Sequence, residues 1–164
     1  MLTGIEGQVL PVAENNYLAL LYVNELLTTM LPPGEANTEV FSAYFVLLQN
    51  AVAKLEESSL RKFELELLKI LGYFPDISAD AVSGQAIDED LHYQFIINDG
   101  FVACEATARD SVSGSVVIDW CRGDYSGESV LRLARSVLRS TIDFNLHGKT
   151  LKSRDVFSEM MRRK

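Results

Sequence analysis

The chain has 164 residues, 48% of them hydrophobic and 23% charged, and a formal net charge of −8. This size suits one compact domain that buries about two thirds of its unfolded surface without a metal or a disulfide. The acidic balance argues against general nucleic-acid binding by the chain as a whole, because phosphate contacts need a positive surface. There is no apolar run of about 18 residues and no signal-peptide pattern, so we expect a cytoplasmic protein with no membrane association.

Residues 1–16 have no hydrophobic period and read as a loop or linker, and three helices follow in close succession. Each is preceded by residues that can cap it: Asn15 or Asn16 before 17–30, Asn37 or Thr38 before a helix to about 55, and Ser58 or Ser59 before 60–71. The first is so apolar that we expect it to be surrounded by protein. The apolar positions of the second are Val40, Phe41, Tyr44, Phe45, Leu48, Val52 and Leu55. Short turns between three such helices predict a bundle.

The helix at 60–71 has the clearest amphipathic pattern. Its core positions are Leu60, Phe63, Leu67, Ile70 and Leu71, and its solvent positions are Lys62, Glu66 and Lys69. Leu65 and Leu68 fall outside the predicted core stripe, on either side of Arg61. A cation between two leucines can hold an acidic, apolar peptide end, with the guanidinium binding a carboxylate. The alternative is that the leucines pack on another helix while Arg61 is solvated. Gly72 and Pro75 end the helix.

The pattern changes after Pro75. Two short apolar runs, 92–97 and 101–104, are separated by the turn sequence Asn98-Asp99-Gly100, which predicts a β-hairpin. Residues 115–118 can add a third strand. We therefore expect a mainly α fold, a helical bundle with a small three-strand insert at about 76–119.

A further helix begins at Asp124 or Ser126 and runs to about Phe144. Its apolar positions are Val130, Leu131, Ala134, Val137, Leu138 and Thr141, and its basic stripe is Arg132, Arg135 and Arg139. That stripe can meet phosphates or acidic residues of a neighbouring helix, although a solvated face is the commoner meaning. Gly148 is a stop, and Ser153 can cap a terminal helix through Met161. Residues 149–164 carry six basic side chains against two acidic ones, in contrast to the rest of the chain.

No catalytic or phosphate-binding motif is present. The two histidines, His92 in the predicted hairpin and His147 in a loop, have no partner recognisable from the sequence, and Cys104 and Cys121 form no C-x-x-C pair. We predict two free thiols and a protein that is not an enzyme and needs no cofactor.

Three blocks in order point to a family: YVNELL at 22–27, LRKFEL at 60–65 with LGY at 71–73, and GKTLKSR at 148–154 followed by Phe157. Together they closely resemble the C-terminal part of the bacterial recombination mediator RecO. The resemblance implies that residues 17–164 form the family's C-terminal helical domain. It also implies that the N-terminal oligonucleotide-binding barrel is missing, with 1–16 as the linker that remains.

In many RecO proteins the hairpin region is a zinc module with two C-x-x-C pairs. Here Asp80 and Ser83 match the first pair, and Ala103 and Ala106 match the second, with Cys104 one place off. One thiol and scattered carboxylates cannot close a tetrahedral zinc site, so we expect no metal. A remnant site at Asp80 and Cys104 is the alternative.

The family role implied by the resemblance is in DNA repair by the RecF pathway. RecO proteins bind the acidic, phenylalanine-ended tail of single-stranded DNA-binding protein, anneal strands, and act with RecR to load RecA. The arginine of the L-R-x-F-E block belongs to the family's tail site, which carries over to Arg61. We expect Lys62 to assist it and Leu60, Leu65 and Leu68 to hold the aromatic end. Single-stranded DNA would be bound mainly by the missing domain.

The alternative is direct DNA binding by the basic C-terminal end, through Lys149, Lys152 and Arg154, with Arg162 and Arg163. Lys152 and Arg154 can instead tie the C-terminus to the bundle. Salt dependence discriminates between the two functions, because several phosphate contacts make affinity fall steeply with salt.

Overall fold

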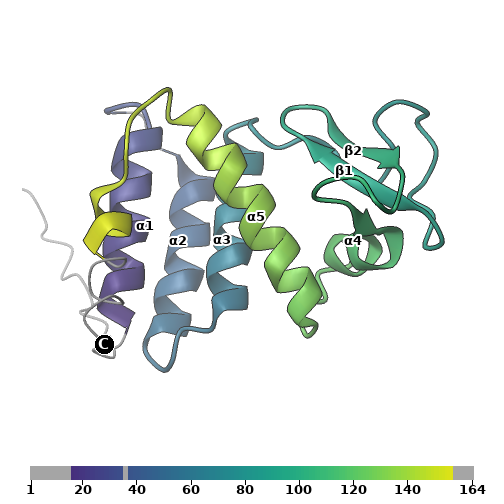
Figure 1. The fold of residues 1–164 in the computed structure, drawn as a ribbon. Coiled ribbons are helices and arrows are strands. Elements are labelled where there is room, and N and C mark those ends of the chain that lie inside the picture. The colour runs from purple at the N-terminus through teal and green to yellow at the C-terminus, as the bar shows by residue number, and fades with distance from the viewer. Residues whose placement is uncertain (1–15, 35–36, 157–164) are drawn as a thin grey trace, which may run out of the picture.

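The computed structural model describes residues 16–34 and 37–156 (Figure 1). Its elements are α1 (Tyr17–Met30), α2 (Thr38–Ala51), α3 (Glu57–Ile70), β1 (His92–Ile96), β2 (Gly100–Cys104), β3 (Val112–Ser113), α4 (Gly114–Cys121) and α5 (Glu128–Asn145). Residues 152–156 are also helical. The mainly helical class with a small antiparallel sheet is confirmed. The predicted linker lies, except for Asn16, outside the described residues.

Helices α1, α2 and α3 lie side by side, and α5 crosses in front of α3 (Figure 1). The strands and α4 sit at the end of the molecule away from α1 (Figure 1). One apolar core runs through both parts, and its fully buried large side chains include Leu26, Leu47, Leu67, Tyr93, Phe101, Trp120, Leu138 and Ile142. None of the helices in the described ranges is long and apolar enough to cross a membrane.

Helix α1 has the predicted bounds, ending just before the proline pair. Asn16 precedes it, but its side chain does not cap α1: it donates to the carbonyls of Ala51 and Ala53, at 2.8 and 2.5 Å, and accepts from the backbone N–H of Leu55 at 3.1 Å. The expectation that α1 is surrounded by protein is wrong as far as the described residues 16–34 and 37–156 are concerned. Tyr17 and Leu21 are half-exposed because α1 lies at the edge of the bundle.

Helix α2 is capped by Asn37, one of the two residues predicted for this role. The Asn37 side chain accepts a hydrogen bond from the N–H of Val40 at 3.0 Å. The helix ends at Ala51 rather than near residue 55. Its buried side is Val40, Leu47 and Ala51. Of the predicted apolar stripe, Phe41, Phe45 and Val52 are exposed, with Phe41 at 67%.

Helix α3 begins before the predicted serine cap. Its first residue is Glu57, and Ser58 and Ser59 lie inside the first turn. Gly72 ends it as expected: with φ at +73° it lets the N–H of Tyr73 reach the carbonyl of Leu68 at 2.8 Å. Lys62, Glu66 and Lys69 are exposed, as the pattern predicts.

The predicted hairpin is present. Strands β1 and β2 pair antiparallel, with Phe95 opposite Phe101, and the sheet order is β2-β1-β3. Asn98 in the turn has a positive φ of 70°. The expected strand at 115–118 is wrong, because those residues belong to α4, which turns Val117 and Trp120 into the core.

Helix α5 begins at Glu128, after the predicted caps. Asp124 and Ser126 form a turn instead, with the Ser126 N–H donating to the Asp124 carboxylate at 2.9 Å. The predicted terminal helix begins at residue 152, so Ser153 lies within it rather than capping it, and its part beyond 156 lies outside the described residues.

Candidate functional site on α3

Arg61 is not a surface arginine. It is only 9% exposed, and its Nη1 lies 3.1 Å from Oε2 of Glu64, one turn along α3. Glu64 is 1% exposed. Arg61 Nε, which is buried, has no hydrogen-bond partner within the described chain, and Glu64 Oε2 meets Arg61 as an ion pair without hydrogen-bond geometry. The two charges are therefore buried together, and one donor has no partner in the described chain.

Glu64 joins α3 to α1. Its Oε1 accepts a hydrogen bond of 2.7 Å from the Tyr22 hydroxyl, and the Arg154 guanidinium lies 5.6 Å from the centre of the Tyr22 ring. Burial, and then the Glu64 carboxylate, raise the pKa of Tyr22 above its usual range. Burial also raises the pKa of Glu64, against the opposing effect of Arg61. Tyr22 thus remains a proton donor to Glu64 at any neutral pH.

The three leucines predicted for the tail site differ in their burial. Leu60 and Leu65 are half-buried and still reach the surface, whereas Leu68 is fully buried in the core. The prediction that Leu68 lies off the core stripe is wrong, because α5 packs against α3 and widens its buried face. Lys62 is exposed, and its Nζ lies 5.3 Å from the centre of the Tyr125 ring.

The arginine stripe of α5 is largely paired within the protein. Arg135 forms a bidentate ion pair with Glu57. Nε of Arg139 lies 3.9 Å from Oδ2 of Asp143. Arg132 is exposed. Of the three meanings that the sequence allowed, contact with an acidic residue of a neighbouring helix holds for Arg135, whereas Arg139 pairs within α5 and Arg132 is solvated.

The C-terminal basic residues divide into two kinds. Arg154 pairs with Asp143 and covers Tyr22, so it ties the chain end to the bundle. Glu25 supports the same segment by accepting from the backbone N–H groups of Lys152 and Ser153, at 2.7 and 2.8 Å. The Lys149 and Lys152 side chains are exposed.

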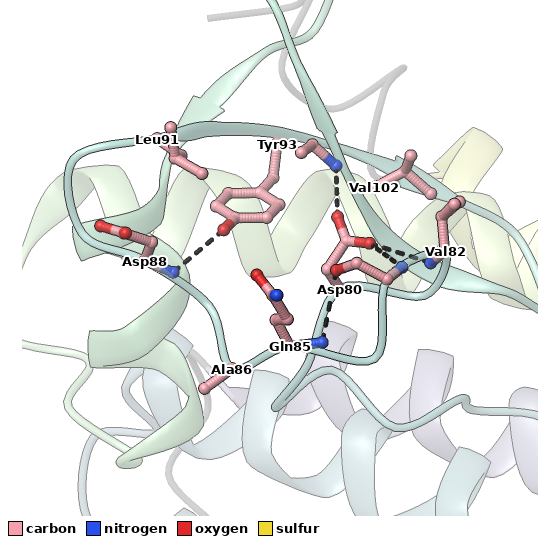
Figure 2. A pocket seen from close by; sticks show the side chains of 10 residues that line it. Asp80, Val82, Gln85, Ala86, Asp88, Leu91, Tyr93 and Val102 are labelled. Carbon is pink, nitrogen blue, oxygen red and sulfur yellow. Dashed lines mark hydrogen bonds between the residues drawn. The ribbon is translucent and has the colours of Figure 1, made fainter.

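Asp80 organises the insert, as Figure 2 shows. Its Oδ1 accepts from the N–H groups of Val82 and Ser83, at 2.9 and 2.6 Å, and its Oδ2 accepts from Ala103 on β2 at 2.7 Å. These bonds, Ser83 first and then Ala103, lower the pKa of Asp80 to about 2. A hollow beside it is lined by Gln85 and Tyr93, among others (Figure 2).

The positions that match a zinc module do not fit the metal. Ala103 and Ala106 have no ligating atom, and the carboxylate of Asp80 already accepts three backbone hydrogen bonds. In the part of the chain that the structure describes, no three His, Cys, Asp or Glu side chains form a metal-binding group. Cys104 and Cys121 are free thiols.

Sequence reasoning missed Glu64. It lies four residues after Leu60 and next to Phe63, so helical geometry places it on the apolar side of α3. An acidic residue within an apolar stripe needs a buried partner, and that signal was present. The Glu57–Arg135 pair has no comparable signal, because its residues are 78 positions apart.

The fold and this site define a helical-bundle domain with a small antiparallel insert and a buried ion pair on its third helix. A family model described as Recombination protein O C terminal matches residues 15–155. The chain belongs to this RecO C-terminal family.

Three relatives place it more closely. It is 34% identical over 152 residues to DNA repair protein RecO of Mannheimia succiniciproducens, which covers 92% of this chain and 67% of that protein. It is 34% identical to the protein of the same name from Psychromonas ingrahamii, over 93% of this chain and 67% of the relative. With RecO of Legionella pneumophila it shares 31% identity over 84% of this chain and 60% of the relative. The chain thus spans two thirds of these proteins or less.

Proposed function

We propose that this chain acts in DNA repair as the C-terminal part of a RecF-pathway recombination mediator. In this role it binds the acidic tail of single-stranded DNA-binding protein and works with RecR in strand annealing and RecA loading. The observation that carries the proposal is the family match across residues 15–155, in a chain whose similar relatives are named DNA repair proteins.

The proposed tail site is centred on Arg61. Lys62 supplies an exposed cation for the tail's carboxylates, and the half-buried Leu60 and Leu65 offer apolar contact to its aromatic end. Leu68 supports this surface from beneath, since it is fully buried. The Arg61 guanidinium lies largely beneath this surface, and Glu64 fixes its position.

A fluorescence-anisotropy titration with two probes tests the proposal. One probe is an acidic, phenylalanine-ended peptide, and the other is a single-stranded oligonucleotide. We expect micromolar peptide binding and weaker DNA binding. DNA binding without peptide binding would overturn the tail site.

Variants of α3 locate the binding. Lys62→Ala is expected to weaken the peptide about two- to fivefold, as for an exposed charge pair. Lys69→Ala is the matched control, because Lys69 is an exposed lysine two turns further along the same helix. For Arg61 the suitable variant is Arg61→Met with Glu64→Leu, which removes both buried charges together. We expect this variant to stay folded and to lose tenfold or more in affinity, about the value of a charge-assisted hydrogen bond. Unchanged affinity would remove Arg61 from the site.

Direct DNA contact remains the second candidate function. The exposed side chains of Lys149 and Lys152 favour it, whereas Arg154 is engaged with Asp143 and Tyr22. Arg162 and Arg163 lie outside the described residues.

A further inference from the structure

Glu57 and Arg135 form the best-defined exposed ion pair of the described chain. Arg135 Nε donates to Oε1 of Glu57 at 2.7 Å, and its Nη2 donates to Oε2 at 2.8 Å. The two parallel bonds are the fork geometry with which a guanidinium recognises any carboxylate. Arg135 is therefore already shaped, in the free protein, as a carboxylate receptor.

The pair lies beside the proposed tail site. Glu57 is one helical turn before Arg61 on α3, so the two side chains share a face. The bonds from Arg135, and the nearby positive charge of Arg61, both lower the pKa of Glu57. Glu57 is thus bound by the Arg135 guanidinium of α5 and lies in the positive field of Arg61 on α3.

The two arginines differ in how readily they can be released. The side chains of Arg61 and Glu64 are 11% and 1% exposed, so separating them would leave a buried charge without its partner. Those of Arg135 and Glu57 are 46% and 37% exposed, so water can solvate either partner when they separate. Only the second pair can exchange its carboxylate at small cost.

We propose that Arg135 is a second carboxylate-binding residue of the tail site and that Glu57 occupies it until an acidic peptide displaces it. The inference rests on the proposed function, because it assigns a further contact to the same partner. Glu57 then acts as an internal competitor: its carboxylate holds Arg135 in the binding geometry and lowers the apparent affinity for the tail.

The experiment is a peptide titration, by anisotropy, of paired variants of this chain. Glu57→Gln is expected to tighten binding about two- to fivefold, the range of one exposed charge pair. Glu66→Gln makes the same charge change on the opposite side of α3 and should leave affinity unchanged. Arg135→Ala is expected to weaken binding by about the same factor. Arg139→Ala, one turn further along α5, is the control for that loss.

The double variant Glu57→Gln Arg135→Ala separates competition from a general effect of charge. If Glu57 acts by occupying Arg135, the double variant should bind no more tightly than Arg135→Ala alone. A gain from Glu57→Gln that persists without Arg135, or that Glu66→Gln reproduces, would overturn the inference. A purely structural pair would lower the melting temperature in both single variants without the opposite shifts in affinity.

Failure of this inference and failure of the proposed function give different results. If the unaltered chain does not bind the peptide, both fall. If it binds, and Lys62→Ala weakens it while the Glu57 and Arg135 variants bind as the unaltered chain does, only the inference falls.

Discussion

The buried pair of Arg61 and Glu64 shows how one residue constrains the interpretation of another. Burying two charges costs several kcal/mol in lost hydration, and their attraction offsets that cost only while both are present. Tyr22 completes the pair by donating to Glu64. A single substitution at Arg61 therefore reports first on folding and only then on binding.

Arg61→Ala should lower the free energy of unfolding by about 3–5 kcal/mol, because it leaves the Glu64 carboxylate buried without its cation. Arg61→Met with Glu64→Leu should recover most of that loss, since apolar side chains of similar size can fill the pocket. Urea denaturation followed by circular dichroism measures both. A loss below about 1 kcal/mol for Arg61→Ala would show that Glu64 takes up a proton instead.

Asp80 gives a second prediction at this scale. Its pKa in the folded protein, about 2, lies below the ordinary value of 3.8. The stabilisation of the fold by the Asp80 carboxylate is therefore fully present above pH 3.8 and is lost as the pH falls towards 2. Asp80→Asn replaces one accepting oxygen by an amide, so the N–H group that donates to that oxygen, of Ser83 or of Ala103, should exchange about tenfold faster at neutral pH. Amides of α5 serve as the internal control. Equal protection in the two proteins would contradict the role of the carboxylate.

At the scale of elements, the sequence predicted α1, α3 and the hairpin well, because each has a clear period or turn signal. It failed at 115–118, where a short β-branched run is equally compatible with a strand or a buried helix. The choice between the two depends on tertiary contacts that the local pattern does not show. At the start of α4, for example, Gly114 packs so closely on residue 88 that a Cβ added to it would lie 1.8 Å from the carbonyl oxygen of Asp88. Likewise, periodicity grouped Phe41 with the core, although no element of the described chain covers it.

In the candidate site too, local spacing predicted some features and missed those that depend on long-range contacts. Helical spacing placed Arg61 beside Leu65, and it placed Lys62 on the surface. It could not show which element packs against α3. Leu68 is buried because α5 returns to α3 late in the sequence, and the same return brings Arg135 to Glu57. These are long-range contacts, for which local periodicity carries no information.

The segment 152–156 depends on one acidic residue of α1. Glu25 accepts from the Ser153 hydroxyl and from two backbone N–H groups at the start of that helical segment, and the Ser153 hydroxyl contributes most to lowering the pKa of Glu25. Glu25→Gln should therefore release the segment, and trypsin should cleave after Lys152 or Arg154 several times faster. Glu66→Gln is the control on an exposed glutamate.

The pH dependence of this contact follows from the direction in which the pKa of Glu25 is shifted. Because the pKa of Glu25 is lowered in the folded protein, the contact stabilises the chain above the ordinary glutamate value of 4.5 and is lost as the pH falls through the folded pKa. The melting temperature of Glu25→Gln should thus approach that of the unaltered chain in acid. A constant difference at every pH would contradict the assignment.

For the whole molecule, the net charge of −8 affects the binding of both proposed ligands, nucleic acid and an acidic peptide tail. An acidic surface repels nucleic acid at long range, and it equally repels an acidic tail, so either ligand must be bound by a local basic region. Around α3 that region includes the exposed Lys62 and the buried Arg61, with Arg135 from α5, beside apolar side chains. At the C-terminal end of the described chain that region is Lys149 and Lys152.

Salt dependence distinguishes the two regions in the intact chain. Each phosphate contact to a single strand contributes a slope of about −0.7 to the dependence of log affinity on log salt, so two lysines contribute about −1.4. Substituting Lys149 and Lys152 by alanine should make the DNA slope shallower by that amount and leave peptide affinity unchanged. At about 0.15 M salt, where the screening length is about 8 Å, we expect the peptide to bind more tightly than DNA, because its apolar contacts are not screened. Tighter binding of DNA under that condition, with an unchanged peptide response in the Lys62→Ala variant, would favour the DNA-binding function over the tail site.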